Sequence, residues 1–116
     1  METLIERKKV KEKFLVEATE HGKAVAIGDH KKANAIHKKL QNLYKKSKEE
    51  NIADVFEEML TDENENVRLW SAIFSLKTST VIAEKALQEL TKLSSITGLT
   101  AKTTLHLWKE GKMNLL

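Results

Sequence analysis

The scarcity of helix-breaking residues constrains this chain more than any other feature. Its 116 residues contain no proline and only four glycines, and they are rich in lysine, glutamate, leucine and alanine, which are good helix formers. Such a chain can be helical over most of its length. Its hydrophobic fraction of 41% and charged fraction of 32% are typical of a globular protein, and its length is that of one domain. We therefore expect a single all-α domain over residues 1–116.

Apolar periodicity and capping residues divide the chain into helices. Gly28 and Asp29 mark the clearest boundary, because glycine ends helices and aspartate caps the next one. Asn64, Thr80 and Thr100 are expected to cap later helices. The ranges expected to be helical are 2–27, 30–48, 52–60, 65–76, 80–93 and 100–110. Short polar connections between them predict about three antiparallel hairpins.

Two features predict how the helices pack. Residues 65–76 have almost no polar face, which places this helix and Trp70 in the centre of the domain. Gly22 costs its helix about 1 kcal/mol relative to alanine, so we expect a neighbouring helix to approach closely there, with His21 as a packing residue. By contrast, residues 1–13 are less regular and form, in this interpretation, a charged helical extension.

Charge is unevenly distributed along the chain. Residues 31–48 contain seven lysines and no acid, whereas residues 49–65 contain eight acids and no base. Lysine doublets repeat every seven residues and so line one stripe of the second helix. This stripe either contacts nucleic-acid phosphates or is a solvated helix face. The whole chain contains only two arginines, although arginine is the preferred residue for reading bases, and the neighbouring acids would repel a polyanion. Both observations favour a solvated face. The stripe consists of Lys31, Lys32, Lys38, Lys39, Lys45 and Lys46.

The sequence shows no recognisable catalytic or metal-binding pattern. There is no cysteine, the four histidines include no pair spaced three or four residues apart, and no nucleophile elbow or glycine-rich phosphate loop occurs. We expect a protein that is not an enzyme and that uses no metal or cofactor. Trp108, near the end of the last helix, is equally consistent with a binding anchor and with a core residue.

Targeting signals are also missing from the sequence. The charged N-terminal segment lacks the apolar core of a signal peptide, and no run approaches the roughly 20 apolar residues that span a membrane. We therefore expect a cytoplasmic protein that does not associate with membranes.

The segment Leu60–Leu76 resembles a HEAT repeat. An aspartate in the turn, Val-Arg at the start of the second helix, and small and leucine residues beyond it match that pattern. In the repeat, the turn acid can pair with the arginine. The matching residues are Asp62, Val67, Arg68, Ala72 and Leu76.

The C-terminal pattern Gly98-Leu, Thr104-Leu105, Trp108 and Gly111-Lys112 is similar to a bacterial family of small HEAT-like proteins catalogued as a domain of unknown function. The resemblance covers roughly residues 10–113 and implies an α-α superhelix of about three hairpins. It provides no catalytic residues. It implies a partner-binding role, such as regulation or immunity to a toxin.

These observations favour a protein-binding module, because stacked helical hairpins present curved, extended surfaces. The alternative function is nucleic-acid binding through the lysine stripe. Either a monomer or a weak homodimer is compatible with the sequence.

Overall fold

The described part of the molecule is entirely helical. The computed structural model describes the backbone of residues 2–112 and the side chains of residues 6–112. Within this range no strand occurs, which confirms the predicted all-α class. The elements are α1 (Glu2–Ala26), α2 (His30–Glu49), the 3-10 helix η1 (Ala53–Met59), α3 (Glu65–Ser75), α4 (Thr80–Leu90) and α5 (Ile96–Lys109).

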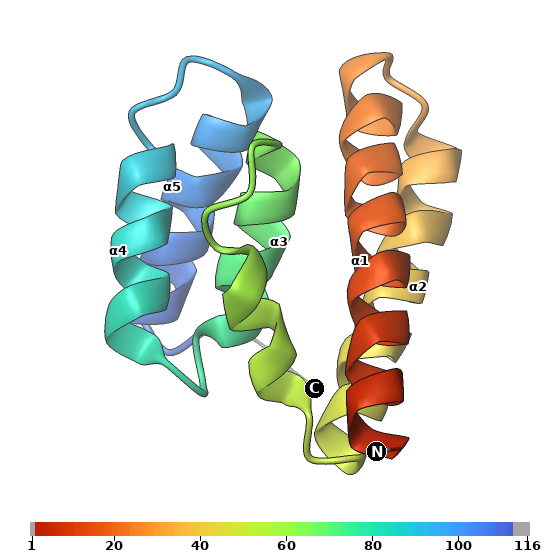
Figure 1. The fold of residues 1–116 in the computed structure, drawn as a ribbon. Coiled ribbons are helices and arrows are strands. Elements are labelled where there is room, and N and C mark those ends of the chain that lie inside the picture. The colour runs from red at the N-terminus through yellow and green to blue at the C-terminus, as the bar shows by residue number, and fades with distance from the viewer. Residues whose placement is uncertain (1, 113–116) are drawn as a thin grey trace.

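The helices form antiparallel pairs around α3. The α1–α2 hairpin lies on one side and the α4–α5 hairpin on the other, with η1 and α3 between them (Figure 1). Helix α3 packs against α1, η1, α4 and α5, and nine of its eleven residues are buried. The central position predicted for this helix is therefore confirmed.

Two of the predicted caps are present. The Asp29 carboxylate accepts a hydrogen bond from the Lys32 amide at 3.0 Å, and Gly28 has a φ of +75°, which suits glycine. The Asn64 side chain accepts bonds from the amides of Asn66 and Val67 at 2.8 and 3.1 Å. Both caps satisfy amides that the helix itself leaves without partners.

Two other predicted caps are wrong. The hydroxyls of Thr80 and Thr100 donate to the carbonyls of Leu76 and Ile96, four residues earlier, instead of accepting from amides. Helix α5 begins at Ile96 and includes Gly98, which the sequence analysis placed in a loop. A Cβ on Gly98 would lie 2.1 Å from the Leu93 carbonyl oxygen, so this glycine permits a close approach of the preceding turn.

The segment predicted as a helix over residues 52–60 is a 3-10 helix of seven residues. Its apolar residues still face the core. Phe56 contacts the rings of Phe14, Tyr44 and Phe74, and centroid distances within this four-ring cluster range from 4.6 to 6.0 Å. The cluster joins α1, α2, η1 and α3.

The N-terminal half of α1 also belongs to the packed domain. Val10 is 7% exposed and lies in the hydrophobic core. Arg7 and Lys11, on the same helix, form ion pairs with η1. Further along α1, the close approach expected at Gly22 is present, because a Cβ there would lie 2.9 Å from the Cβ of Asn66 in α3.

The ion pair expected in the HEAT-type turn is absent from the described structure. The Asp62 carboxylate accepts the Asn64 amide at 3.0 Å, and Arg68 forms no ion pair with it. Asp62 is held by its own turn, which leaves the arginine without this partner. Val67, which also matches the HEAT pattern, is buried, with 1% of its surface exposed. Within the described range, no helix is both long and apolar enough to cross a membrane.

Candidate functional site: a groove between the two halves

A groove with a volume of about 700 Å³ separates the α1–α2 hairpin from α3 and α5. Such a volume lies within the range of ligand pockets in proteins. Each wall comes from a helix, so the groove is bounded by rigid elements. Its lining residues include His21 and Gly22 from α1, His37, Gln41 and Tyr44 from α2, Asn66, Leu69, Trp70 and Ile73 from α3, and Ile96, Thr97, Thr100, Thr104 and Leu107 from α5.

Three rings meet at the base of this groove. The indole Nε1 of Trp70 donates to Nδ1 of His21 at 3.4 Å. The rings of His21 and His37 both stand edge-on to Trp70, with centroid distances of 5.2 and 5.1 Å and interplanar angles of 87°. Because Nδ1 of His21 accepts this bond, the arrangement selects a neutral imidazole that carries its proton on Nε2.

Asn66 connects this ring cluster to the backbone of α1. Its Nδ2 donates to the carbonyl of Ala18 at 2.6 Å and lies 3.5 Å from Nδ1 of His21. Gly22 makes room for the Asn66 side chain between the helices. The two helices are therefore fixed to each other at the point where the groove begins.

The groove is weakly charged. Burial lowers the pKa of His21, and the nearby His37 lowers it further. Burial alone lowers the pKa of His37 and raises that of Tyr44. Both lowered histidine pKa values favour the neutral imidazole.

The wall formed by α5 combines apolar and hydroxyl groups. Ile96 is 53% exposed although it lines the groove. The hydroxyl of Ser95, beside it, is buried and has no hydrogen-bond partner within the described structure. An incoming apolar group can therefore cover Ile96.

The chemistry of the groove suits binding. Its lining offers an apolar surface, neutral hydroxyls and amides, two imidazoles, and two residues of opposite charge, Glu65 and Lys112. Among the described residues, no group of three or more histidine, cysteine or acidic side chains is placed to hold a metal ion. Burial of apolar groups is thus the main interaction that this arrangement can provide.

The residues singled out from the sequence lie mostly outside the groove. All six lysines of the stripe are exposed on α2. Trp108 is partly buried against the core, and its Nε1 donates to Glu84 in α4 at 2.8 Å. Trp70, which is 6% exposed, does line the groove, where it combines a core position with a binding surface.

Most of the groove was missed by the sequence analysis. Its residues come from four helices, and the spacing within one helix does not reveal which face meets another helix across a gap. The one available signal was His21 beside Gly22, which was interpreted as a packing residue. That interpretation is confirmed, because His21 contacts Trp70 and Asn66.

Comparison with known proteins adds no family assignment, because no family model, curated protein or solved structure matches the chain. The resemblance to HEAT repeats and to the small bacterial family therefore stays a prediction. Fold and site together define an all-α protein with a preformed apolar groove.

Proposed function

We propose that this chain is a protein-binding module whose groove receives the apolar face of a helix from a partner protein. The observation that carries this proposal is the apolar, weakly charged groove between the α1–α2 hairpin and the α3–α5 pair. Its volume of about 700 Å³ is open to solvent in the isolated chain. A partner would gain free energy by removing this surface from water.

The dimensions of the groove favour a helical partner. The lining residues of α5 extend from Ile96 to Leu107, which corresponds to about 16.5 Å along the helix axis. A docked helix presents apolar anchors at positions i, i+3 or i+4, and i+7, over about 10 Å. Three such side chains fit along this wall. The toxin-immunity or regulatory role implied by the family resemblance would be one use of such a site.

Photo-crosslinking tests the location of the site. A photoreactive amino acid is placed at Thr100, which lines the groove, or at Thr103, an exposed threonine on the same helix outside it. One protein should crosslink from position 100 and not from position 103. Crosslinks that are equal at both positions would contradict a groove-specific partner.

Affinity measurements with the crosslinked partner then test the chemistry. Ile96→Glu places a charge in the groove, whereas Leu99→Glu changes an equally apolar, 66% exposed residue of α5 outside it. A charge left unpaired in an apolar contact is costly, so Ile96→Glu should weaken binding by at least about tenfold. Leu99→Glu should leave the affinity within about twofold. Equal affinities for both variants would refute the proposal.

A further inference from the structure

The structure brings lysines of α1 to the lysine stripe of α2. A shallow cleft of about 280 Å³ between these helices is lined by Lys9 and Lys13 from α1 and by Lys39 and Lys46 from α2. Val10, Asn42 and Leu43 lie between them, and Glu6 is the one acidic residue among the lining side chains that the structure describes. We call this the lysine cleft. It shares no lining residue with the groove.

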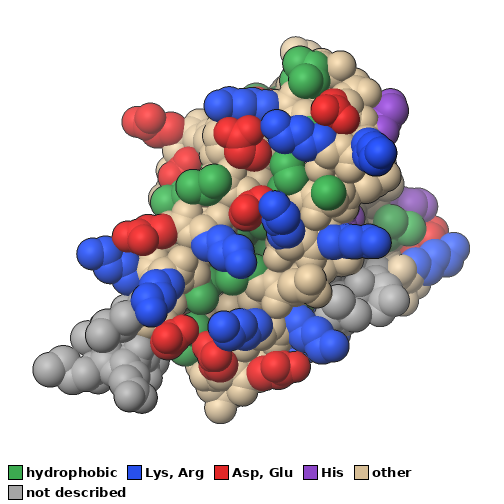
Figure 2. Space-filling model, turned by 90° about the vertical axis from the view of Figure 1, so that its right-hand side faces the viewer, with side chains coloured by type: hydrophobic (Ala, Val, Ile, Leu, Met, Phe, Trp, Pro, Cys, Tyr) green, Lys and Arg blue, Asp and Glu red, His purple; other side chains and the backbone are tan. Residues whose placement is uncertain are grey.

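Few lysines on this side of the molecule are neutralised. Of the lysines in the stripe and the lysine cleft, only Lys32 has a carboxylate within ion-pair distance in the described structure, Glu20 at 3.9 Å. Figure 2 shows this side, on which acidic side chains are mixed with basic ones. The excess of positive charge comes from α2, because residues 31–48 contain no acid.

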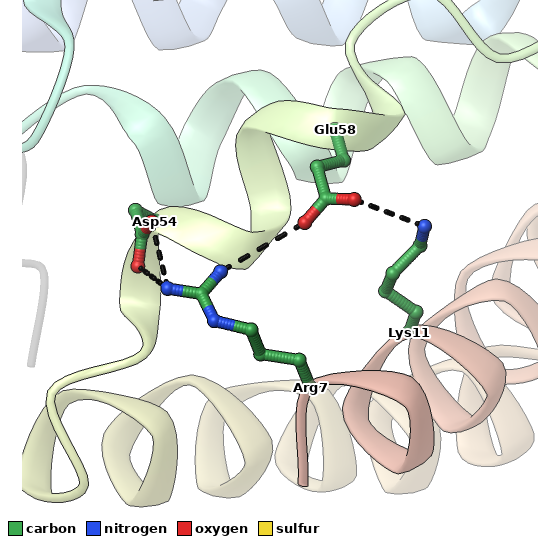
Figure 3. Close-up of polar contacts among 4 residues, drawn as sticks. All are labelled: Arg7, Lys11, Asp54 and Glu58. Atoms are coloured by element: carbon green, nitrogen blue, oxygen red, sulfur yellow. Dashed lines mark hydrogen bonds and ion pairs between the residues drawn. The ribbon is translucent and has the colours of Figure 1, made fainter. Parts of the chain in front are cut away.

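The acidic stretch that follows α2 is partly neutralised elsewhere. Asp54 accepts two hydrogen bonds from Nη2 of Arg7, at 2.8 and 2.9 Å (Figure 3). Glu58 lies 3.8 Å from Nη1 of Arg7 and 3.1 Å from Nζ of Lys11. These two basic residues of α1 point toward η1, whereas Lys9 and Lys13 line the cleft toward α2. The repulsion of polyanions expected from these acids is therefore reduced on the α1–α2 side.

We infer that the lysine cleft and the adjoining stripe of α2 bind the phosphate backbone of nucleic acid. Lys39 and Lys46 are about 10.5 Å apart along α2, so their ammonium groups can contact different phosphates of one backbone. A surface rich in lysine is also better matched to phosphates than to a protein partner, because lysine is depleted at protein interfaces and arginine is enriched there. None of the described residues that line the cleft is an arginine, which could read bases, so binding should not depend on sequence.

Fluorescence anisotropy with a labelled duplex DNA of arbitrary sequence tests this inference. Four phosphate contacts predict that log K falls with log salt concentration with a slope of about −3.6. The test variant replaces Lys9, Lys13, Lys39 and Lys46 with glutamine. The control variant replaces Lys85, Lys92, Lys102 and Lys109, which are exposed residues of the C-terminal half, so both variants lose the same charge. Thermal unfolding followed by circular dichroism verifies that both variants fold.

The wild type and the control should bind the duplex with similar affinity, and two unrelated sequences should bind equally. The cleft variant should bind at least about tenfold more weakly, with the magnitude of its salt slope reduced by about 3.6. Three results would overturn the inference: no binding by the wild type at low salt, an equal loss in both variants, or binding to polyglutamate as tight as to DNA of equal charge. The last result would indicate an acidic protein partner instead.

Discussion

The contact between Gly22 and Asn66 predicts that a substitution which normally stabilises a helix will destabilise this protein. In a helix interior, alanine is favoured over glycine by about 1 kcal/mol. Here the new Cβ would lie 2.9 Å from Cβ and 3.0 Å from Cγ of Asn66. Rotation of the Asn66 side chain cannot move its Cβ, which is fixed to the backbone of α3. The two helices must therefore separate.

The cost of that separation has two parts. Overpacking of this kind costs about 1–3 kcal/mol. Separation also breaks the buried hydrogen bond from Asn66 Nδ2 to the Ala18 carbonyl, at 2.6 Å, which costs about 1–3 kcal/mol more. After the gain in helix propensity is subtracted, Gly22→Ala should lower the free energy of unfolding by about 1–5 kcal/mol.

Urea denaturation followed by circular dichroism measures this change. The same substitution is also made in an Asn66→Gly background, where the clashing Cβ is absent. There Gly22→Ala should be neutral or should stabilise by up to about 1 kcal/mol, so the sign of the effect differs between the two backgrounds. A higher urea midpoint for Gly22→Ala in the otherwise unchanged chain would refute the reasoning.

Two further predictions concern the ring cluster. Trp70→Ala should lower the free energy of unfolding by about 3–5 kcal/mol in the same urea assay, since the ring is 6% exposed and contacts Phe74; a near-neutral result would contradict its central position. Folding lowers the pKa values of His21 and His37. Below the ordinary histidine pKa of 6.5, the unfolded chain therefore binds more protons than the folded chain. The free energy of unfolding should fall as the pH decreases through about 6.5 and should stay constant above it. Urea midpoints at about pH 7.5 and 5.5 measure this loss. The loss should shrink in His37→Gln and persist in His30→Gln, whose exposed ring lies outside the groove; equal losses in both variants would exclude the ring cluster as the cause.

The fold was largely predictable because its signals are local. The side-chain caps at Asp29 and Asn64 depend on residues within one helical turn. The apolar character of residues 65–76 is likewise a property of one short segment. Errors arose where one residue type has two local roles. A threonine hydroxyl can cap a helix or donate to a carbonyl four residues earlier, and Thr80 and Thr100 do the latter. Gly98 could end a helix or allow close packing inside one.

The candidate site was much less predictable because it depends on distant pairs. The bond between Trp70 and His21 joins residues 49 positions apart, and no spacing within either helix indicates it. The lysine stripe was visible from its seven-residue repeat, whereas the contribution of Lys9 and Lys13 required knowing which face of α1 adjoins α2. The pairing of Asp54 with Arg7 and of Glu58 with Lys11 was likewise not predictable, because each pair spans 47 residues.

The four-ring cluster has a consequence for how the chain folds during synthesis. Phe14 and Tyr44 belong to a hairpin that is complete at Glu49, but Phe74, the last ring to cover them, is made 25 residues later. At ribosomal rates of about 5–20 residues per second, the aromatic face of this hairpin is uncovered for roughly 1–5 s. In that interval the nascent chain exposes a surface that chaperones or other nascent chains can bind. Association of misfolded chains should therefore begin at the first hairpin.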